Sequence, residues 1–198
     1  MSRLETALRA IASELDRLGR SWAVVGGLAV SARTEPRFTR DIDLALAVAD
    51  DADAEELVRA LLASGYRVLA SLEQEAVGRL ATVRLEAPGE GSAGVVIDLL
   101  FASSGVESEV VLAADLLEVF PGLPLRVARG GHLLALKTLS NSPTRPQDPV
   151  DIAALLRDAT AADLQEARQV TDLIMARGYH RGRDLFALLD EHQKRAGA

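Results

Sequence analysis

Residues 24–46 read VVGGLAVSARTEPRFTRDIDLAL, and this stretch carries the main evidence for the fold class. The apolar run that ends at the glycine pair predicts a short buried strand over 21–27, followed by a short helix and a polar loop. A second strand is expected over 41–48. Because side chains i and i+2 of a strand point to the same face, Asp41 and Asp43 project together.

The spacing of apolar residues elsewhere predicts the remaining elements. Helices are expected over 3–18, 53–64 and 107–118, and strands over 66–70, 79–87 and 94–103. The last two strands flank the turn-rich segment PGEGSAG, which favours an antiparallel hairpin, and residues 119–128 are expected to be extended. Only helices are expected from about residue 130. We therefore predict an α+β protein, with a core that contains a mixed sheet over 1–129 and a helical domain over 130–198.

The chain has 198 residues, no cysteine and a formal net charge of −7. The lack of cysteine excludes disulfides and thiolate metal sites and indicates a reducing compartment. We see no secretion signal and no run of about 18 apolar residues that could span a bilayer, so we expect a cytoplasmic protein without membrane contact. The acidic balance argues against a general nucleic-acid coat, although it allows a local basic surface.

A third aspartate, Asp98, lies inside the apolar strand VVIDLLF. A charge there is costly unless it is paired or bound to a metal ion. If Asp98 meets Asp41 and Asp43, the three carboxylates repel one another, and a divalent cation relieves the repulsion. Magnesium suits such oxygen ligands and is completed by substrate phosphates, with manganese as the alternative ion. The other interpretation is structural: Asp-x-Asp caps a turn, and Asp98 is hydrogen-bonded at a sheet end.

Gly26 and Gly27 follow the first apolar strand and open a short helix. Glycine lets the backbone approach a phosphate closely, and a helix N-terminus offers free N–H groups. Ser31, about one turn further on, is a candidate hydroxyl donor to the same nucleotide. The pair does not match the phosphate-binding loop or the dinucleotide fingerprint, and a tight turn is the simpler explanation of a glycine pair alone.

The combined pattern, VVGG, thirteen further residues, DIDL and a later VIDL strand, resembles the polymerase-β-like nucleotidyltransferase superfamily. The longer strings GGLAVSARTEPRFTRDIDLAL and LLALKTLSNSPTRPQDPVDIAAL are similar to its AbiEii-type branch, over roughly residues 20–160. This resemblance implies that the glycine pair, Asp41 and Asp43 bind magnesium and a nucleoside triphosphate (NTP), and that Asp98 completes the site. It also implies a bacterial toxin with a cognate antitoxin partner, acting on a tRNA end or another RNA.

Lys137 shares a helical face with leucines, which is typical either of a packed stem with its amine at the rim or of a cation placed on a triphosphate. The resemblance favours the second interpretation. Asp148 and Asp151 flank a helix start, where capping explains both residues. The AbiEii-type pattern also has aspartates here, which makes Asp151 a candidate base toward the acceptor.

Two groups of basic residues lie outside these motifs. Arg33, Arg37 and Arg40 precede the Asp-x-Asp pair and could steer an anionic nucleotide, with Arg40 as the candidate nucleotide-binding residue. Solvation of a polar loop is at least as good an explanation for Arg37. The second group consists of Arg177, His180, Arg181 and Arg183, which suggests a helix end or an RNA contact.

The sequence therefore predicts an enzyme that moves a nucleoside monophosphate from an NTP to an acceptor hydroxyl and releases pyrophosphate. Two other hypotheses remain. The acceptor could be a small molecule such as an aminoglycoside, which the acidic net charge would attract. Alternatively, the chain is a non-catalytic module that binds a nucleotide or a protein partner, although the presence of all three carboxylates counts against this.

Overall fold

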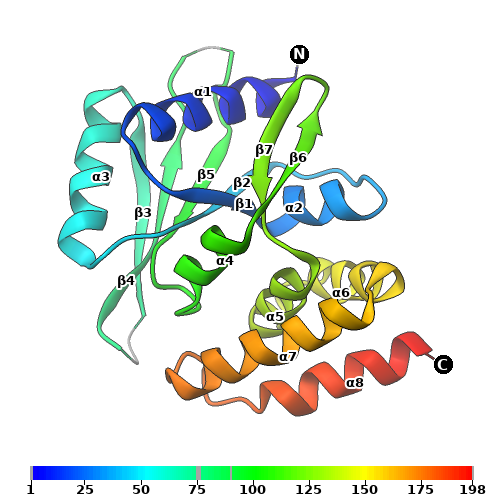
Figure 1. Cartoon of the computed structure of the whole chain (residues 1–198). Coiled ribbons are helices and arrows are strands. Elements are labelled where there is room, and N and C mark those ends of the chain that lie inside the picture. The colour runs from blue at the N-terminus through cyan, green and yellow to red at the C-terminus, as the bar shows by residue number, and fades with distance from the viewer. Residues whose placement is uncertain (1, 75–76, 90, 198) are drawn as a thin grey trace.

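A computed structural model describes residues 2–74, 77–89 and 91–197 and shows a seven-stranded mixed sheet with helices packed around it (Figure 1). The strand order is β3-β4-β5-β2-β1-β7-β6. Strand β2 pairs with β5 in parallel, and β1 pairs with β7 in parallel, whereas all other neighbours are antiparallel. The sheet is therefore mixed, as the sequence predicts.

The elements have the following bounds. The strands are β1 (Trp22–Val25), β2 (Asp41–Leu46), β3 (Arg67–Gln74), β4 (Arg79–Glu86), β5 (Val96–Leu100), β6 (Asp115–Phe120) and β7 (Leu123–Val127). The helices are α1 (Arg3–Arg17), α2 (Gly26–Arg33), α3 (Asp51–Ala63), α4 (Glu107–Ala113), α5 (Gly130–Ser140), α6 (Gln147–Asp158), α7 (Ala161–Ala176) and α8 (Leu185–Gly197).

The pairing of β4 with β5 is antiparallel, as expected for the two strands that flank the turn-rich segment. Residue 90 of that segment lies outside the described residues. The helix predicted over 107–118 is wrong in its second half, because α4 ends at Ala113 and β6 begins at Asp115. Strand β6 forms a hairpin with β7 through a turn in which Gly122 adopts a φ of 69°. This cross-strand pairing outweighs the local helical preference of the alanines and leucines before it.

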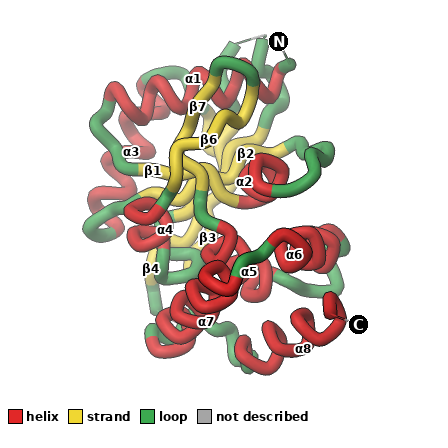
Figure 2. Tube along the Cα trace, turned by 45° about the vertical axis from the view of Figure 1, so that its right-hand side comes forward, coloured by secondary structure: helices red, strands yellow, loops and turns green. Residues whose placement is uncertain are grey.

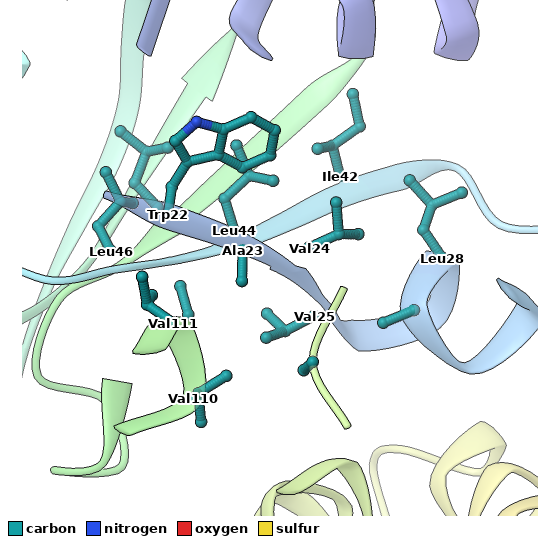
Figure 3. Packing of buried hydrophobic residues seen from close by; sticks show 14 of the residues in the cluster. Trp22, Ala23, Val24, Val25, Leu28, Ile42, Leu44, Leu46, Val110 and Val111 are labelled. Carbon is teal, nitrogen blue, oxygen red and sulfur yellow. The ribbon is translucent and has the colours of Figure 1, made fainter. Parts of the chain in front are cut away.

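The buried core explains why β1 and β2 lie at the centre of the sheet. Figure 3 shows Trp22, Leu44 and Ile42 projecting to the side on which α1 lies, while Val25 and Val110 of α4 lie on the other side. All five side chains are 5% exposed or less. Burial of each large apolar side chain contributes about 2 kcal/mol, which fixes the register of the two central strands.

The C-terminal part consists of helices α5 to α8, which lie together below the sheet (Figure 2). Helix α5 packs against α6, α7 and α8 and also contacts α2. The guanidinium of Arg183 donates to the carbonyl oxygens of Leu139 and, at 2.6 Å, of Asn141. These bonds cap the end of α5 and hold the loop between α7 and α8 beside it. In the described part of the chain, no helix is long and apolar enough to cross a membrane.

Candidate active site

Three neighbouring strands bring two of the predicted aspartates together. In the sheet register Val25 of β1 lies opposite Asp43 of β2, and Asp43 lies opposite Asp98 of β5. Arg84 of β4 extends this row, because it lies opposite Asp98. Residues directly opposite each other project to the same face of a sheet, so the two carboxylates and the guanidinium share one face.

Glycine is the only residue type that fits at position 26, beside Asp43. Its φ is 62°, and a Cβ atom there would lie 2.0 Å from Oδ2 of Asp43. A side chain at Gly27 would be crowded as well, with its Cβ 2.8 Å from Nη2 of Arg37. The glycine pair thus opens α2 at a point where the Asp43 carboxylate lies directly against the backbone.

The side chain of Asp43 is partly buried between these groups, and its surroundings disfavour the ionised carboxylate unless a cation is close by. Burial and, next, the charge of Asp98 raise its pKa from 3.8 to about 6. Lys137 lowers the pKa again, and Asp41 adds to the rise. Charged carboxylates in this position therefore stabilise a bound cation more than an isolated aspartate would.

Asp98 and Arg84 form a two-pronged ion pair. Nε of Arg84 donates to Oδ1 at 2.8 Å, and Nη2 donates to Oδ2 at 2.7 Å. Asp41 is exposed at the start of β2 and makes no such pair among the described residues. Within residues 2–74, 77–89 and 91–197, no three acidic or histidine side chains lie close enough together to hold one ion. The structure thus joins Asp43 and Asp98 and leaves Asp41 at the rim.

Lys137 lies between two buried carboxylates. Its Nζ is 2.7 Å from Oδ1 of Asp148 and 2.8 Å from Oδ2 of Asp151, whose side chains are 4% and 1% exposed. Arg37 binds Asp151 from the other side, through Nε at 2.6 Å and Nη2 at 2.7 Å. The hydroxyl of Ser140 donates to Asp148 at 2.8 Å. Burial works against ionisation of Asp151, but the bonds from Arg37 and Lys137 prevail and lower its pKa.

The capping role expected for Asp148 and Asp151 is wrong. Helix α6 begins at Gln147, so both aspartates lie inside its first turns, and its N-cap residue Pro146 makes no side-chain capping bond. Both carboxylates instead turn inward to Lys137. A buried ammonium is stable only with such partners, and these ion pairs between distant residues outweigh the local preference of aspartate for a helix start.

A pocket of about 170 Å³ opens over this face of the sheet. Its floor consists of alternate residues of β2, β4 and β5, and its roof comes from α5 and from the loops around α6 and α8. The lining includes Val25, Gly26, Asp43, Ala45, Leu72, Thr82, Arg84, Asp98, Leu100, Leu136, Lys137, Ser140, Arg145 and Arg181.

Three predicted nucleotide-binding residues, Gly27, Ser31 and Arg40, lie outside this lining. The hydroxyl of Ser31 donates to the carbonyl oxygen of Gly27 at 3.0 Å and accepts from the backbone N–H of Arg37 at 3.3 Å. Arg40 is exposed, and its guanidinium lies 5.6 Å from the ring centre of Phe38. In this structure Ser31 fixes the loop before β2, and Arg40 covers an exposed aromatic ring.

The arginines of the second basic cluster, Arg177, Arg181 and Arg183, make different contacts. Arg177 binds Glu109, and Arg183 caps α5. Arg181 lines the pocket, and it is the one non-glycine residue with a positive φ, 55°, among the described residues. Burial and, next, the charges of Arg183 and Arg145 lower the pKa of Arg181. Its backbone is thus held in a costly conformation that brings a cation to the pocket.

Arg84 and Arg145 were not anticipated from the sequence as parts of the site, and Arg37 and Asp151 were singled out separately but not as a pair. A signal for Arg84 existed: in the predicted hairpin, its strand lies next to the one that contains Asp98. Arg145, which lines the pocket, and Arg37, which binds Asp151, both lie in loops, and no periodic pattern indicates what a loop residue contacts.

The residues present fit a magnesium ion. Carboxylate oxygens are its preferred protein ligands, and Asp43 and Asp98 offer them side by side. Burial and, next, the charge of Asp98 raise the pKa of Asp43, which a bound cation would offset, and the missing side chain at Gly26 lets the Asp43 carboxylate lie directly against the backbone.

Comparisons with known proteins agree with this geometry. A family model described as "Nucleotidyl transferase AbiEii toxin, Type IV TA system" matches residues 8–197. No curated protein matches the chain. Two solved structures, each with a TM-score of 0.54, are similar to it: the antibiotic-resistance factor ANT(2'')-Ia, at 18% identity over 96% of each chain, and an antigenic nucleotidyltransferase-like protein from Paracoccidioides brasiliensis, at 19% identity over 95% of this chain and 92% of that one. The predicted α+β nucleotidyltransferase fold is therefore confirmed.

Proposed function

The chain belongs to the AbiEii family of nucleotidyl transferase toxins, and on that premise we propose that it moves a nucleoside monophosphate from an NTP to an acceptor hydroxyl. The observation that carries this proposal is the pairing of Asp43 with Asp98 beside Gly26, under the ammonium of Lys137. Carboxylates, a bare backbone and a buried cation are the groups that nucleotidyl transfer requires in one place.

We assign Asp41, Asp43 and Asp98 as ligands of magnesium, or of manganese in its place. When bound, the ion would neutralise the triphosphate and favour ionisation of the acceptor hydroxyl. We propose that backbone N–H groups at Gly26 and Gly27, where α2 begins, bind phosphate oxygens. Exposed Asp41 must turn inward to join Asp43, which a residue at the first position of β2 can do.

Lys137 has a defined role in this scheme. Its ammonium has three N–H donors, of which two are directed to Asp148 and Asp151. The third is free to bind a phosphate oxygen of the NTP. The two carboxylates, with Arg37 behind Asp151, thus fix the position of the ammonium. This assigns Asp151 to positioning Lys137 rather than to proton transfer, because a carboxylate with a lowered pKa is a weak base.

In the transfer step, the acceptor oxygen forms a bond to the α-phosphorus, and the bond from that phosphorus to the bridging oxygen breaks. Pyrophosphate leaves with its charge balanced by Lys137. Asp98 lies on the far side of Asp43 from Gly26, and we propose that its carboxylate, once released by Arg84, takes the proton of the attacking hydroxyl. Two adjacent carboxylates with different partners can in this way serve the nucleotide and the acceptor separately.

An RNA acceptor, such as a tRNA end, fits the charges beyond Asp98. Arg84, Arg145 and Arg181 all line the pocket. The carboxylate of Glu107, which also lines the pocket, accepts from the backbone N–H and the hydroxyl of Ser104, at 2.7 and 2.8 Å. Arginines attract a phosphate backbone and repel a cationic aminoglycoside. The small-molecule acceptor and the non-catalytic module therefore become outcomes of the test.

The family description names a type IV toxin–antitoxin system, so we propose a bacterial toxin with a cognate antitoxin. Its proposed substrates, NTP and RNA, place it in the cytoplasm. We also propose that residues 1–129 and 130–198 act as a catalytic core and a helical domain, since Lys137, Arg145 and Arg181 reach over the sheet from the helical part.

Transfer of label tests this function. The protein is incubated with each α-labelled NTP, magnesium and total RNA, beside an Asp41→Ala/Asp43→Ala variant. Label in RNA with wild type alone is the expected result. If no label moves but the wild type binds NTP with magnesium, the RNA acceptor is wrong and aminoglycosides are tried next. If it binds neither, the enzyme interpretation falls and the non-catalytic module replaces it.

A further inference from the structure

We propose that Arg84 is an exchangeable counter-cation of Asp98, which holds this carboxylate when the site is free of metal and releases it when a divalent cation binds. The inference rests on the proposed function and adds a residue to it. It predicts that the affinity of the site for a divalent cation is limited by an ion pair within the protein itself.

The geometry of the pair leaves little of Asp98 for a metal. Both carboxylate oxygens accept from the guanidinium, at 2.8 and 2.7 Å. A two-pronged arginine–carboxylate pair occupies the in-plane lone pairs that face its fork. Since Asp98 lies directly beside Asp43 in the sheet, a cation shared by these two aspartates must compete with Arg84 for the same oxygens.

The two partners differ in their freedom to move. The side chain of Asp98 is 12% exposed, whereas that of Arg84 is 46% exposed. Asp98 sits in β5 between two strands, so its carboxylate stays where the sheet puts it. The guanidinium lies on a long side chain at the pocket surface and can swing into solvent at small cost. Exchange therefore proceeds by departure of the arginine.

Electrostatics make the two cations mutually exclusive. Arg84 also interacts with the charges of Asp41 and Asp43, so it neutralises part of the whole acidic group. A divalent ion placed among these carboxylates would lie within a few ångströms of the guanidinium, and like charges at that separation repel. Lys137 cannot take part in such an exchange, because it is held by Asp148 and Asp151.

The same strand offers a matched control. Arg79 of β4 also pairs with an aspartate, through Nε at 2.6 Å from Oδ1 of Asp51, and its side chain is 35% exposed. It does not line the pocket. Arg84→Gln and Arg79→Gln therefore remove the same charge from the same strand, each from an aspartate partner, and only the first variant frees a carboxylate of the site.

The test is a titration of Mn²⁺ into the full-length protein without nucleotide, followed by calorimetry and by the electron paramagnetic resonance signal of free Mn²⁺. Because a charge-assisted pair at a partly exposed position holds its carboxylate moderately, Arg84→Gln should bind Mn²⁺ about tenfold more tightly than wild type. Arg79→Gln should match wild type. Adding Asp98→Asn to Arg84→Gln should remove the gain.

Equal or weaker Mn²⁺ binding by Arg84→Gln, with label transfer by the wild type intact, would overturn the exchange and leave the proposed function standing. If neither protein binds Mn²⁺, the exchange and the metal-dependent function fall together. Circular dichroism shows whether each variant folds. If Arg84→Gln does not, Arg84→Lys takes its place, and this variant, whose single amine cannot hold both oxygens of Asp98, should still bind Mn²⁺ more tightly than the wild type.

Discussion

Replacing Asp43 by asparagine should stabilise the metal-free protein. In the folded state the pKa of Asp43 is raised from 3.8 to about 6, first by burial and then by Asp98. The folded protein therefore binds the proton more tightly than the unfolded chain. The ionised carboxylate costs stability at every pH above its folded pKa, and the cost disappears as the pH falls toward the unfolded value. Asparagine has the same shape without the charge.

The size of the effect follows from the difference between the two pKa values. Since one pKa unit corresponds to about 1.4 kcal/mol, the difference corresponds to about 3 kcal/mol at most. Asp43 keeps some contact with water, so we use about 2 kcal/mol. For a chain of this length, that free energy raises Tm by roughly 4–8 °C.

The assay is thermal unfolding with a chelator present, at about pH 8 and about pH 4, where linkage predicts a large and a small difference respectively. Asp51→Asn is the control. The bond from Arg79 holds the pKa of Asp51 below its usual value, so loss of the Asp51 carboxylate should lower Tm at the higher pH. A Tm of Asp43→Asn equal to or below that of wild type at the higher pH would show that Asp43 is not under electrostatic strain.

Other substitutions test the surroundings of the site. Gly26→Ala should abolish binding of magnesium–NTP in calorimetry, because its Cβ would overlap Asp43, whereas Gly122→Ala, with a similar φ of 69° and open space around it, should bind normally; equal binding by both would contradict the close approach. Arg37→Ala should lower the free energy of unfolding in urea by about 2 kcal/mol, since buried Asp151 loses one of its two cations. An unchanged midpoint of urea unfolding would show that the Arg37–Asp151 ion pair does not stabilise the fold. Burial raises the pKa of Glu107, so Glu107→Gln should raise Tm at about pH 8 and have little effect at about pH 4; the opposite pH trend would rule out that cause.

The sequence predicted the parts of the site that depend on local spacing. The alternation of β2 placed Asp43 on the open face, and the apolar context of Asp98 marked it as a paired or metal-binding charge. Adjacent parallel strands then bring the two together. The sequence predicted that all three carboxylates meet, but the structure does not bring Asp41 to the other two, because it lies at the exposed first position of its strand.

What the sequence missed depends on contacts between distant segments. Local capping rules accounted for Asp148, yet its partner is Lys137 from the preceding helix. The segment after Ala113 has the composition of a helix, and only its pairing with β7 makes it a strand. The pocket-lining position of Arg181 depends on a loop conformation held by Arg183. The division at residues 129 and 130 stays a prediction.

Label transfer by Asp43→Asn separates folding from chemistry at this site. The variant is predicted to be at least as stable as wild type, so loss of activity cannot be assigned to unfolding. With an α-labelled NTP, magnesium and RNA, we expect label in the RNA and release of pyrophosphate with wild type, and neither product with Asp43→Asn. Transfer by the folded variant at the wild-type rate would contradict the assignment of Asp43 and Asp98 as the centre of nucleotidyl transfer.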